Sequence, residues 1–269
     1  MREEIFDLPE HILSAVRPHF LTATGLTLLV SVPACLTDPE EPRFPESEVE
    51  PAAPAPRELA PQPTVAKTCP GATRVAQDGL IDDLEDGDAR AAWVCGRSGY
   101  WWVAKADHAL VTTPAGAFAT SDGGSSGSKK AVRFAGKTDP RDQWGAAVGL
   151  NFLESGAFYD ASKYAGVAFK IKASQPNVNV RLKLPDVSTH PEGGVCSKGC
   201  WNSFGKELVV GPEWQDVVVT WGELSQQPDW GDPRPPAITV GKIKNIEWAV
   251  NQGVEFDLVV DDIRFVECG

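Results

Sequence analysis

The chain has 269 residues and a formal net charge of -12 at neutral pH. This charge argues against nucleic acid as a partner and against adsorption to anionic lipid headgroups, because both require a surplus of Lys and Arg on one face. It is compatible with neutral ligands, with cations, or with solubility alone. The hydrophobic fraction of 42% is enough for a packed core, and nine Trp beside three Tyr supply large rings for cores and for flat contacts with ligands.

The N-terminal segment has the features of an export signal. Residues 20–34 carry no charge, and the stretch is shorter than the roughly 20 apolar residues of a membrane span. It ends in Val32-Pro33-Ala34-Cys35, which resembles a bacterial lipobox. The resemblance implies a signal peptide over residues 1–34, cleavage before Cys35 and diacylglyceryl modification of Cys35. The alternative is a buried helix that happens to end in cysteine.

The first ten residues are acidic, whereas a signal peptide normally begins with a basic segment. We interpret this as a sign that translation starts downstream, near Val16.

Residues 35–67 are predicted to be a disordered tether that begins with the lipidated cysteine. Their composition is rich in Pro, Glu and Ala and lacks hydrophobic periodicity, so little surface can be buried to offset the entropy of ordering. Proline and like charges keep such a chain extended. The alternative, a loop within a larger fold, would be unusually long.

Residues 68–269 are predicted to form an all-β domain. Apolar and polar side chains alternate along residues 167–172, 178–184, 246–250 and 256–260, which is the pattern of strands with one buried face. At Asp261-Asp262 the alternation shifts by one residue, which predicts a β-bulge. Clusters of Gly and Pro separate the strands, and no segment has a convincing helical period. These features predict a β-sandwich, most simply a jelly roll.

Six cysteines in an exported chain predict disulfides rather than a zinc site. Cys196 and Cys200 are separated by a short flexible loop and are predicted to pair. With the lipobox cysteine modified, one of the other three is expected to stay unpaired. Cys69 pairs with either Cys268 or Cys95, and both options remain open.

Eight segments follow one another in an order typical of a known family. They are IDDLEDGD (81–88), GRSGYWW (96–102), WGAAVGLNF (144–152), YDASKYAGVAFKIKA (159–173), VRLKLPD (180–186), PEGGVC…C (191–200), EWQDVVVTWGELSQ (213–226) and FDLVVDDIRF (256–265). Together they resemble the galactose-binding-like jelly-roll domains of bacterial surface lipoproteins, which are similar to carbohydrate-binding modules of family 11. The resemblance covers residues 79–266. It departs at Ala106-Asp107, where relatives often carry Asn-Asp.

The resemblance implies a concave sheet whose outward side chains line a ligand groove. Polar residues on and beside the strand 178–184 are candidates for hydrogen bonds to sugar hydroxyls, and an exposed Trp is the candidate stacking ring. The predicted ligand-binding residues are Asn179, Arg181, Lys183, Asp186, His190 and Trp144. Trp201 and Trp248 are further candidate rings, although Trp248 shares the parity of the buried face and is predicted to lie in the core. The alternative for Arg181 and Lys183 is a solvated sheet face.

Two acidic clusters predict one structural calcium ion. The resemblance implies that the first and last strands lie close together, so the run at residues 82–88 is expected to meet the end of the last strand. Hard oxygen ligands suit Ca²⁺, and the predicted ligands are Asp83, Glu85, Asp261 and Asp262. The alternative is a solvated acidic edge.

No catalytic constellation is recognisable, since serine-nucleophile, zinc-protease and phosphate-loop motifs are absent from the sequence. We therefore predict a non-catalytic carbohydrate-binding lipoprotein on the bacterial envelope, held to the membrane only through its lipid anchor, with a polysaccharide or other glycan as partner. The alternative is a structural or protein-interaction lipoprotein with the same fold and no sugar affinity.

Overall fold

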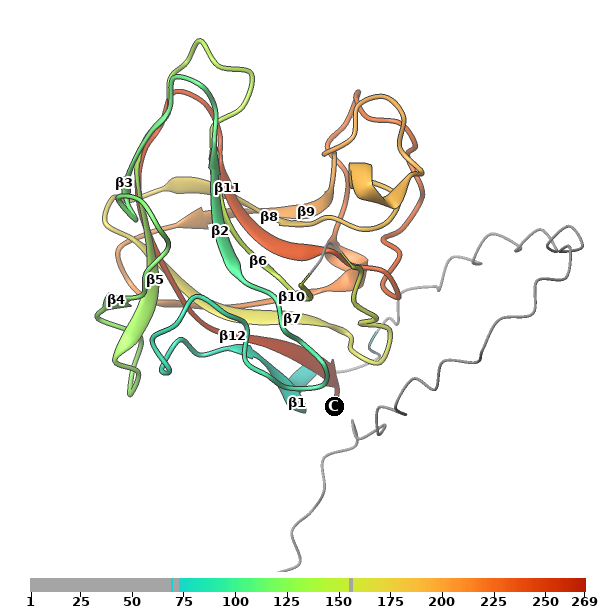
Figure 1. The fold of residues 1–269 in the computed structure, drawn as a ribbon, viewed down its shortest axis with the longest axis horizontal. Helices are drawn as coiled ribbons and strands as arrows, with labels where there is room; N and C mark the ends of the chain where they lie inside the picture. The colour runs from blue at the N-terminus through green and yellow to red at the C-terminus, as the bar shows by residue number, and fades with distance from the viewer. Residues whose placement is uncertain (1–68, 70–72, 155–156) are drawn as a thin grey trace, which may run out of the picture. The chain divides into compact units, whose positions relative to one another are not determined.

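The computed structural model describes residues 69, 73–154 and 157–269. The predicted signal peptide, the tether and the lipidation of Cys35 lie outside these residues. In the described part of the chain, two antiparallel β-sheets pack face to face, and the only helices are two short 3₁₀ turns, η1 (Pro191–Gly193) and η2 (Trp221–Glu223) (Figure 1). None of the described helices is long and apolar enough to cross a membrane. The predicted all-β sandwich is confirmed.

The larger sheet has seven strands in the order β10-β7-β12-β5-β3, with β1 paired to β12 and β4 paired to β5. Its central strand is β12, the last in the chain, which is flanked by β7, β5 and β1. The strand bounds are β1 (Thr73–Asp82), β3 (Leu110–Thr113), β4 (Ser121–Asp122), β5 (Lys130–Lys137), β7 (Gly166–Ala173), β10 (Gln215–Thr220) and β12 (Glu255–Cys268).

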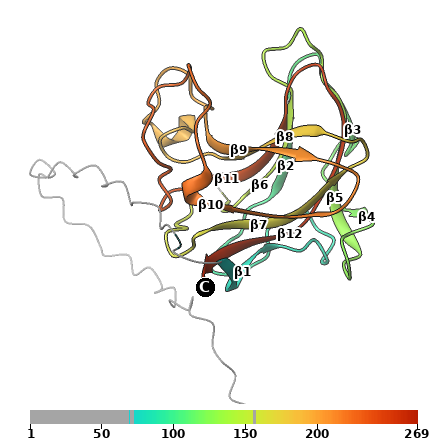
Figure 2. The same cartoon turned by 180° about the vertical axis from the view of Figure 1, so that it is seen from behind.

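The smaller sheet has five strands in the order β2-β6-β11-β8-β9. The bounds are β2 (Trp101–Lys105), β6 (Ala146–Asn151), β8 (Val178–Leu184), β9 (Phe204–Val210) and β11 (Asn245–Val250). Loops at the two ends of its strands project beyond its outward face, formed at one end by residues 138–145 and 251–254 and at the other by residues 186–203 and 225–242 (Figures 1 and 2).

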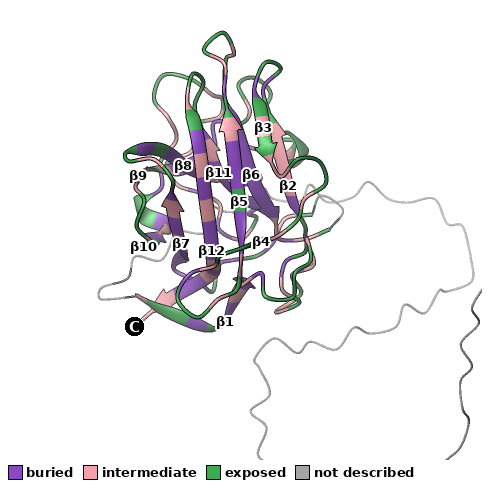
Figure 3. Ribbon diagram, turned by 90° about the vertical axis from the view of Figure 1, so that its left-hand side faces the viewer, coloured by how far each residue is buried: buried purple, intermediate pink, exposed green. Residues whose placement is uncertain are grey.

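The core lies between the sheets and is built from the side chains of each strand that face inward. Buried and less buried residues alternate along β7, β8 and β12, as the sequence period predicts (Figure 3). Trp248 is fully buried, so its predicted core position is confirmed, and it stacks on Trp101 with ring centroids 5.9 Å apart.

The predicted bulge in the last strand is also present. The pairing of β12 with β7 shifts register between Asp261 and Arg264, and Asp262 has a positive φ of 51°. A one-residue phase change therefore lets both halves of this long strand keep their apolar side chains in the core.

Two disulfides are described. Cys196 pairs with Cys200, as predicted, with Cα atoms 5.5 Å apart. Cys69 pairs with Cys268, with Cα atoms 5.2 Å apart, which settles the choice that the sequence left open. The expectation of an unpaired third cysteine is wrong, because no described cysteine is free.

Candidate functional site

The outward face of the five-stranded sheet carries two cross-strand rows of contrasting chemistry. Register places one row across all five strands through Trp102, Gly149, Glu247, Lys183 and Gly205. The aromatic ring of Trp102 stands at one end of this row. An acid, Glu247, and a base, Lys183, lie next to each other between the two glycines. Such a combination can present a flat apolar surface beside fixed hydrogen-bonding groups.

The Trp102 ring lies over Gly149. A Cβ atom built on Gly149 would come within 2.4 Å of Cζ2 and 2.7 Å of Cε2 of the indole, so no other residue fits there without moving the ring. The Trp102 indole N–H donates to Oδ1 of Asn151 at 3.0 Å, and the side chain is half-buried. The ring is therefore held against the sheet by one face and fixed in rotation by its hydrogen bond.

Charged and amide groups lie beside this ring. The Lys183 ammonium pairs with Glu247 at 2.9 Å, and the Glu247 side chain is almost completely buried. Asn245 is 3% exposed, and its Oδ1 has no hydrogen-bond partner in the described structure. It neighbours Asn151 across the β11–β6 ladder. An unpaired buried acceptor is costly, so Asn245 is a locally unfavourable point beneath this face.

Three of the five side chains in the second row are small. It runs through Ala104, Ala147, Ala249, Arg181 and Glu207, so three small side chains stand in succession beside the Trp102 row. Small side chains leave room above the sheet for a ligand to lie along the surface.

Arg181 is only 9% exposed, and its guanidinium is used inside the protein. It pairs with Glu207 at 2.8 Å and donates to the carbonyl oxygens of Ser225 at 2.7 Å and Ser203 at 3.4 Å. The sequence placed Arg181 on the outward face correctly but could not show that the segment near Ser225 is bound to it. Its replacement would disturb this segment, so it would not isolate a ligand contact.

Asp186 and His190 are also engaged within the protein. Asp186 is fully buried, and Oδ1 accepts from the main-chain N–H and hydroxyl of both Ser188 and Thr189, while Oδ2 accepts from the N–H of Thr239 at 2.7 Å. Its hydrogen bonds hold the loop after β8 together, and its carboxylate is not exposed at the surface.

The His190 ring packs edge-on against Trp201 at 4.8 Å, and its Nδ1 accepts the N–H of Glu192 at 3.2 Å. Burial lowers the pKa of this imidazole. The side chain is therefore held inside the loop, and the predicted ligand-binding role for it needs revision.

The remaining predicted ligand residues differ in position. Lys183 joins the Trp102 row, whereas Asn179 is exposed on the same strand nearer its start. Trp144 is 46% exposed and stands in the projecting loop 138–145. The structure thus brings Lys183 to the candidate site, and it leaves Asn179 and Trp144 as flanking groups.

Sequence reasoning missed Trp102, Gly149, Asn151 and Glu247. A signal for Trp102 was present in the Tyr-Trp-Trp run, because adjacent residues of a strand face opposite sides and only one of two tryptophans can enter the core. Gly149 gave no comparable signal, since its run Ala-Ala-Val-Gly-Leu is apolar on both faces.

The predicted calcium ligands do not form one set. Oε1 of Glu85 accepts the N–H groups of Lys129 and Lys130 at 2.7 and 2.8 Å, and these bonds lower the pKa of Glu85. Oδ2 of Asp261 accepts the N–H of Ser125 at 2.7 Å. Glu85 and Asp261 therefore contact the same loop between β4 and β5 through hydrogen bonds, whereas the sequence predicted that the two acidic clusters meet each other.

Oδ2 of Asp262 accepts the Ser125 hydroxyl at 3.2 Å, and Oδ1 of Asp83 faces the N–H of Glu85 at 3.5 Å. Within the described residues no group of three or more His, Cys, Asp or Glu is placed to hold a metal ion. The carboxylate oxygens are turned toward hydrogen-bond donors, which does not fit a calcium cage.

Calcium binding stays a prediction of the sequence alone, and thermal unfolding tests it. A calcium ion bound only to the native state would lower the midpoint in EDTA and raise it again with added Ca²⁺. Mg²⁺ at the same ionic strength is the control. Equal midpoints in EDTA and in Ca²⁺ would overturn the prediction.

No family model matches the chain, and no curated protein matches it. Among solved structures, it is similar in fold to carbohydrate-binding modules.

One similar structure is the family 11 module from Clostridium thermocellum in complex with a β-1,3-1,4-mixed-linked tetrasaccharide, at 14% identity, a TM-score of 0.48, and coverage of 72% of this chain and 98% of that one. Another is a family 30 module, at 13% identity, a TM-score of 0.47, and coverage of 62% and 82%. A family 4 module matches at 14% identity and a TM-score of 0.39, covering 71% and 94%. The likeness concerns the fold alone.

Proposed function

We propose that the outward face of the five-stranded sheet binds a carbohydrate. The observation that carries this proposal is the Trp102 indole, which is laid over Gly149 and fixed by Asn151. A sugar ring can stack its C–H groups on such a surface, while Lys183 and Glu247 supply a donor and an acceptor for its hydroxyls.

We also propose that the domain acts without catalysis. A glycosidase needs an acidic carboxyl group of raised pKa beside a second carboxylate at the ligand. At this face Glu247 is paired with Lys183. Burial raises the pKa of Asp82 to about 7, but this carboxyl lies in the interior, where it accepts the Trp101 indole N–H. That arrangement offers no acid and base at the ligand.

Substitution of Trp102 tests the binding face. Against a panel of β-glucans, xylan and galactans, we expect wild type to bind with modest affinity, since an open sheet face leaves much of a sugar in water. Trp102→Ala is expected to weaken binding at least about tenfold, the equivalent of about 1.4 kcal/mol of lost stacking. Calorimetry measures both proteins.

The matched control is Trp93→Ala, because Trp93 is 80% exposed and lies outside this face. The control should bind like wild type. If wild type binds no member of the panel, the alternative of a structural or protein-interaction lipoprotein replaces this proposal. If Trp102→Ala binds equally well, the ligand uses another face.

We further propose that the domain is displayed on the bacterial envelope through a lipid on Cys35, because the uncharged stretch before it ends in a lipobox-like sequence. Mass spectrometry of the mature protein from a bacterial host is expected to find an N-terminus at Cys35 with added acyl mass. Cys35→Ser should abolish both. A mature chain that begins at Ala34 or earlier, or one without acyl mass, would contradict the proposal.

A further inference from the structure

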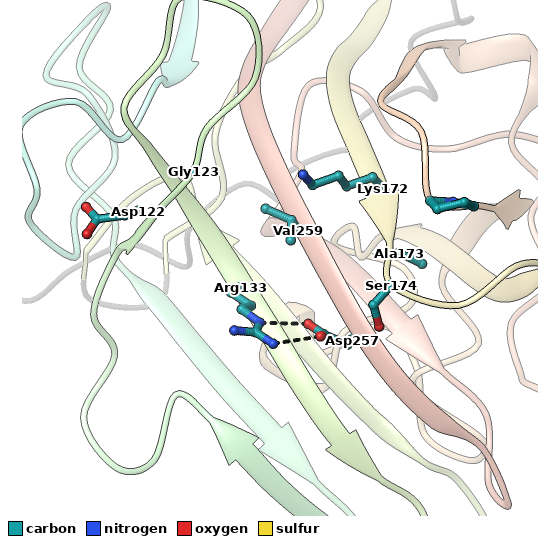
Figure 4. A pocket seen from close by; sticks show the side chains of 9 residues that line it. Asp122, Gly123, Arg133, Lys172, Ala173, Ser174, Asp257 and Val259 are labelled. Atoms are coloured by element: carbon teal, nitrogen blue, oxygen red, sulfur yellow. Dashed lines mark hydrogen bonds and ion pairs between the residues drawn. The ribbon is translucent and has the colours of Figure 1, made fainter.

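The opposite face of the sandwich, on the seven-stranded sheet, contains two adjoining hollows of about 320 and 480 Å³. Both hollows are lined by Arg133, Ser174 and Asp257, so they lie next to each other. Together they form a trough, which we call the seven-stranded-sheet trough, over outward residues of β3, β5, β12 and the end of β7. Figure 4 shows its centre, where Arg133 and Asp257 meet side by side from adjacent strands.

The centre of the trough is rigid and polar. The Arg133 guanidinium makes two hydrogen bonds to the Asp257 carboxylate, at 2.8 and 2.7 Å, and this pairing lowers the pKa of Asp257. Lys172 lies on the neighbouring strand, with its ammonium 4.7 Å from the centre of the Trp214 ring. Both cations are therefore held in place before any ligand arrives.

The charge of the trough is balanced although the whole chain has a net charge of -12. The charged lining residues are three bases and three acids: Arg133, Lys137, Lys172, Asp122, Glu255 and Asp257. The lining also includes the hydroxyls of Ser174, Thr112 and Thr113. Alternating donors and acceptors without net charge suit a neutral ligand rich in hydroxyl groups, and they give no advantage to an anionic or cationic polymer.

One lining group lacks a partner. Oε1 of Gln175, in the larger hollow, is buried and has no hydrogen bond in the described structure. The one aromatic residue that lines the described trough, Phe256, is buried, so this surface offers no stacking platform.

We propose that the seven-stranded-sheet trough is a second binding site, independent of the Trp102 face, for a neutral oligosaccharide chain. Recognition rests on hydrogen bonds to the Arg133–Asp257 pair and to Ser174. Because no ring stacks on the sugar, its affinity is about tenfold lower than that of the Trp102 face.

Amide chemical-shift mapping on Trp102→Ala tests the site, because this variant weakens binding at the first face to no more than the affinity expected of the trough, and the positions of the shifted amides distinguish the two faces. With cellohexaose or xylohexaose at millimolar concentration, the amides of Ser174, Thr112 and Val259 should shift. Ser174→Trp in the same background should remove these shifts, since its side chain would fill the part that both hollows share. Ser126→Trp, at an exposed loop position outside the lining, is the matched control and should leave them unchanged.

The spectra themselves report whether each variant is folded, and Asp257→Asn supplies a second, smaller change that should weaken binding. The proposal is overturned if no neutral hexasaccharide shifts the trough amides, if Ser126→Trp removes the shifts as well, or if oligogalacturonate binds more tightly than the neutral chains. In wild type, shifts confined to the Trp102 face would refute the second site alone. Shifts confined to the trough would refute the proposed Trp102 site alone.

Discussion

Replacing Cys69 and Cys268 together by serine is expected to lower the free energy of unfolding by about 5 kcal/mol. This disulfide joins residues 199 positions apart, next to the Thr73–Cys268 register pair that begins the pairing of β1 with β12. A cross-link that closes so long a loop removes a large amount of conformational entropy from the unfolded chain. Urea unfolding of the oxidised wild type and the double variant measures the difference.

The second disulfide provides the matched control. Cys196 and Cys200 are only 4 positions apart, so the same relation gives about 2 kcal/mol for their joint replacement by serine. The two double variants should therefore differ by about 3 kcal/mol. Equal losses would show that loop closure does not govern the stability of this domain.

Asp82→Asn is expected to remove the pH dependence of the free energy of unfolding that arises from Asp82. The variant should therefore gain stability relative to wild type as the pH rises. The Asp82 carboxyl is 1% exposed and accepts the Trp101 indole N–H and the main-chain N–H of Leu84, each at 2.7 Å. Burial nevertheless raises its pKa to about 7. The folded state therefore binds a proton there that the unfolded chain releases near pH 4.

The direction of the pH effect follows from this raised pKa. The stabilising contribution of protonated Asp82 is complete below pH 4 and is lost as the pH rises through about 7. Asparagine is neutral at every pH, but its NH2 group cannot accept a hydrogen bond, so one of the two N–H donors at this position loses its acceptor and the variant should be less stable than wild type near pH 4 by about 1–3 kcal/mol. Between pH 4 and pH 8 the variant should gain about 4 kcal/mol relative to wild type, an upper figure for a shift of this size. Urea unfolding from pH 4 to pH 8 measures both curves, and parallel curves would refute the prediction.

Strand positions could be predicted from the sequence because burial on one face leaves a period of two. Val178–Leu184 is β8 itself, and the phase change at Asp261-Asp262 marked the bulge of β12. Periodicity also placed Trp248 inside. These features depend on residues close together in the chain, so a short window of sequence contains the information.

The candidate site could be predicted only in part, because it depends on contacts between distant segments. Parity placed Arg181 on the outward face, but its engagement by Ser225 arises from a loop 44 residues away. Likewise, the contact of Trp102 with Gly149 joins strands whose register no local pattern encodes. The pairing of Cys69 required the meeting of the first and last strands, which explains why two options remained.

The Cys69–Cys268 bond also has a mechanical consequence. Any pulling force that enters the domain from the residues before Cys69 passes through this bond directly to the end of β12, the strand at the centre of the larger sheet. Without the bond, the same force would peel β1 away from its neighbour one hydrogen bond at a time. With it, the force acts on β12, which is hydrogen-bonded to β1, β5 and β7, so more hydrogen bonds oppose its release. A pull on the chain before Cys69 is therefore resisted by the central strand of the larger sheet and not by β1 alone.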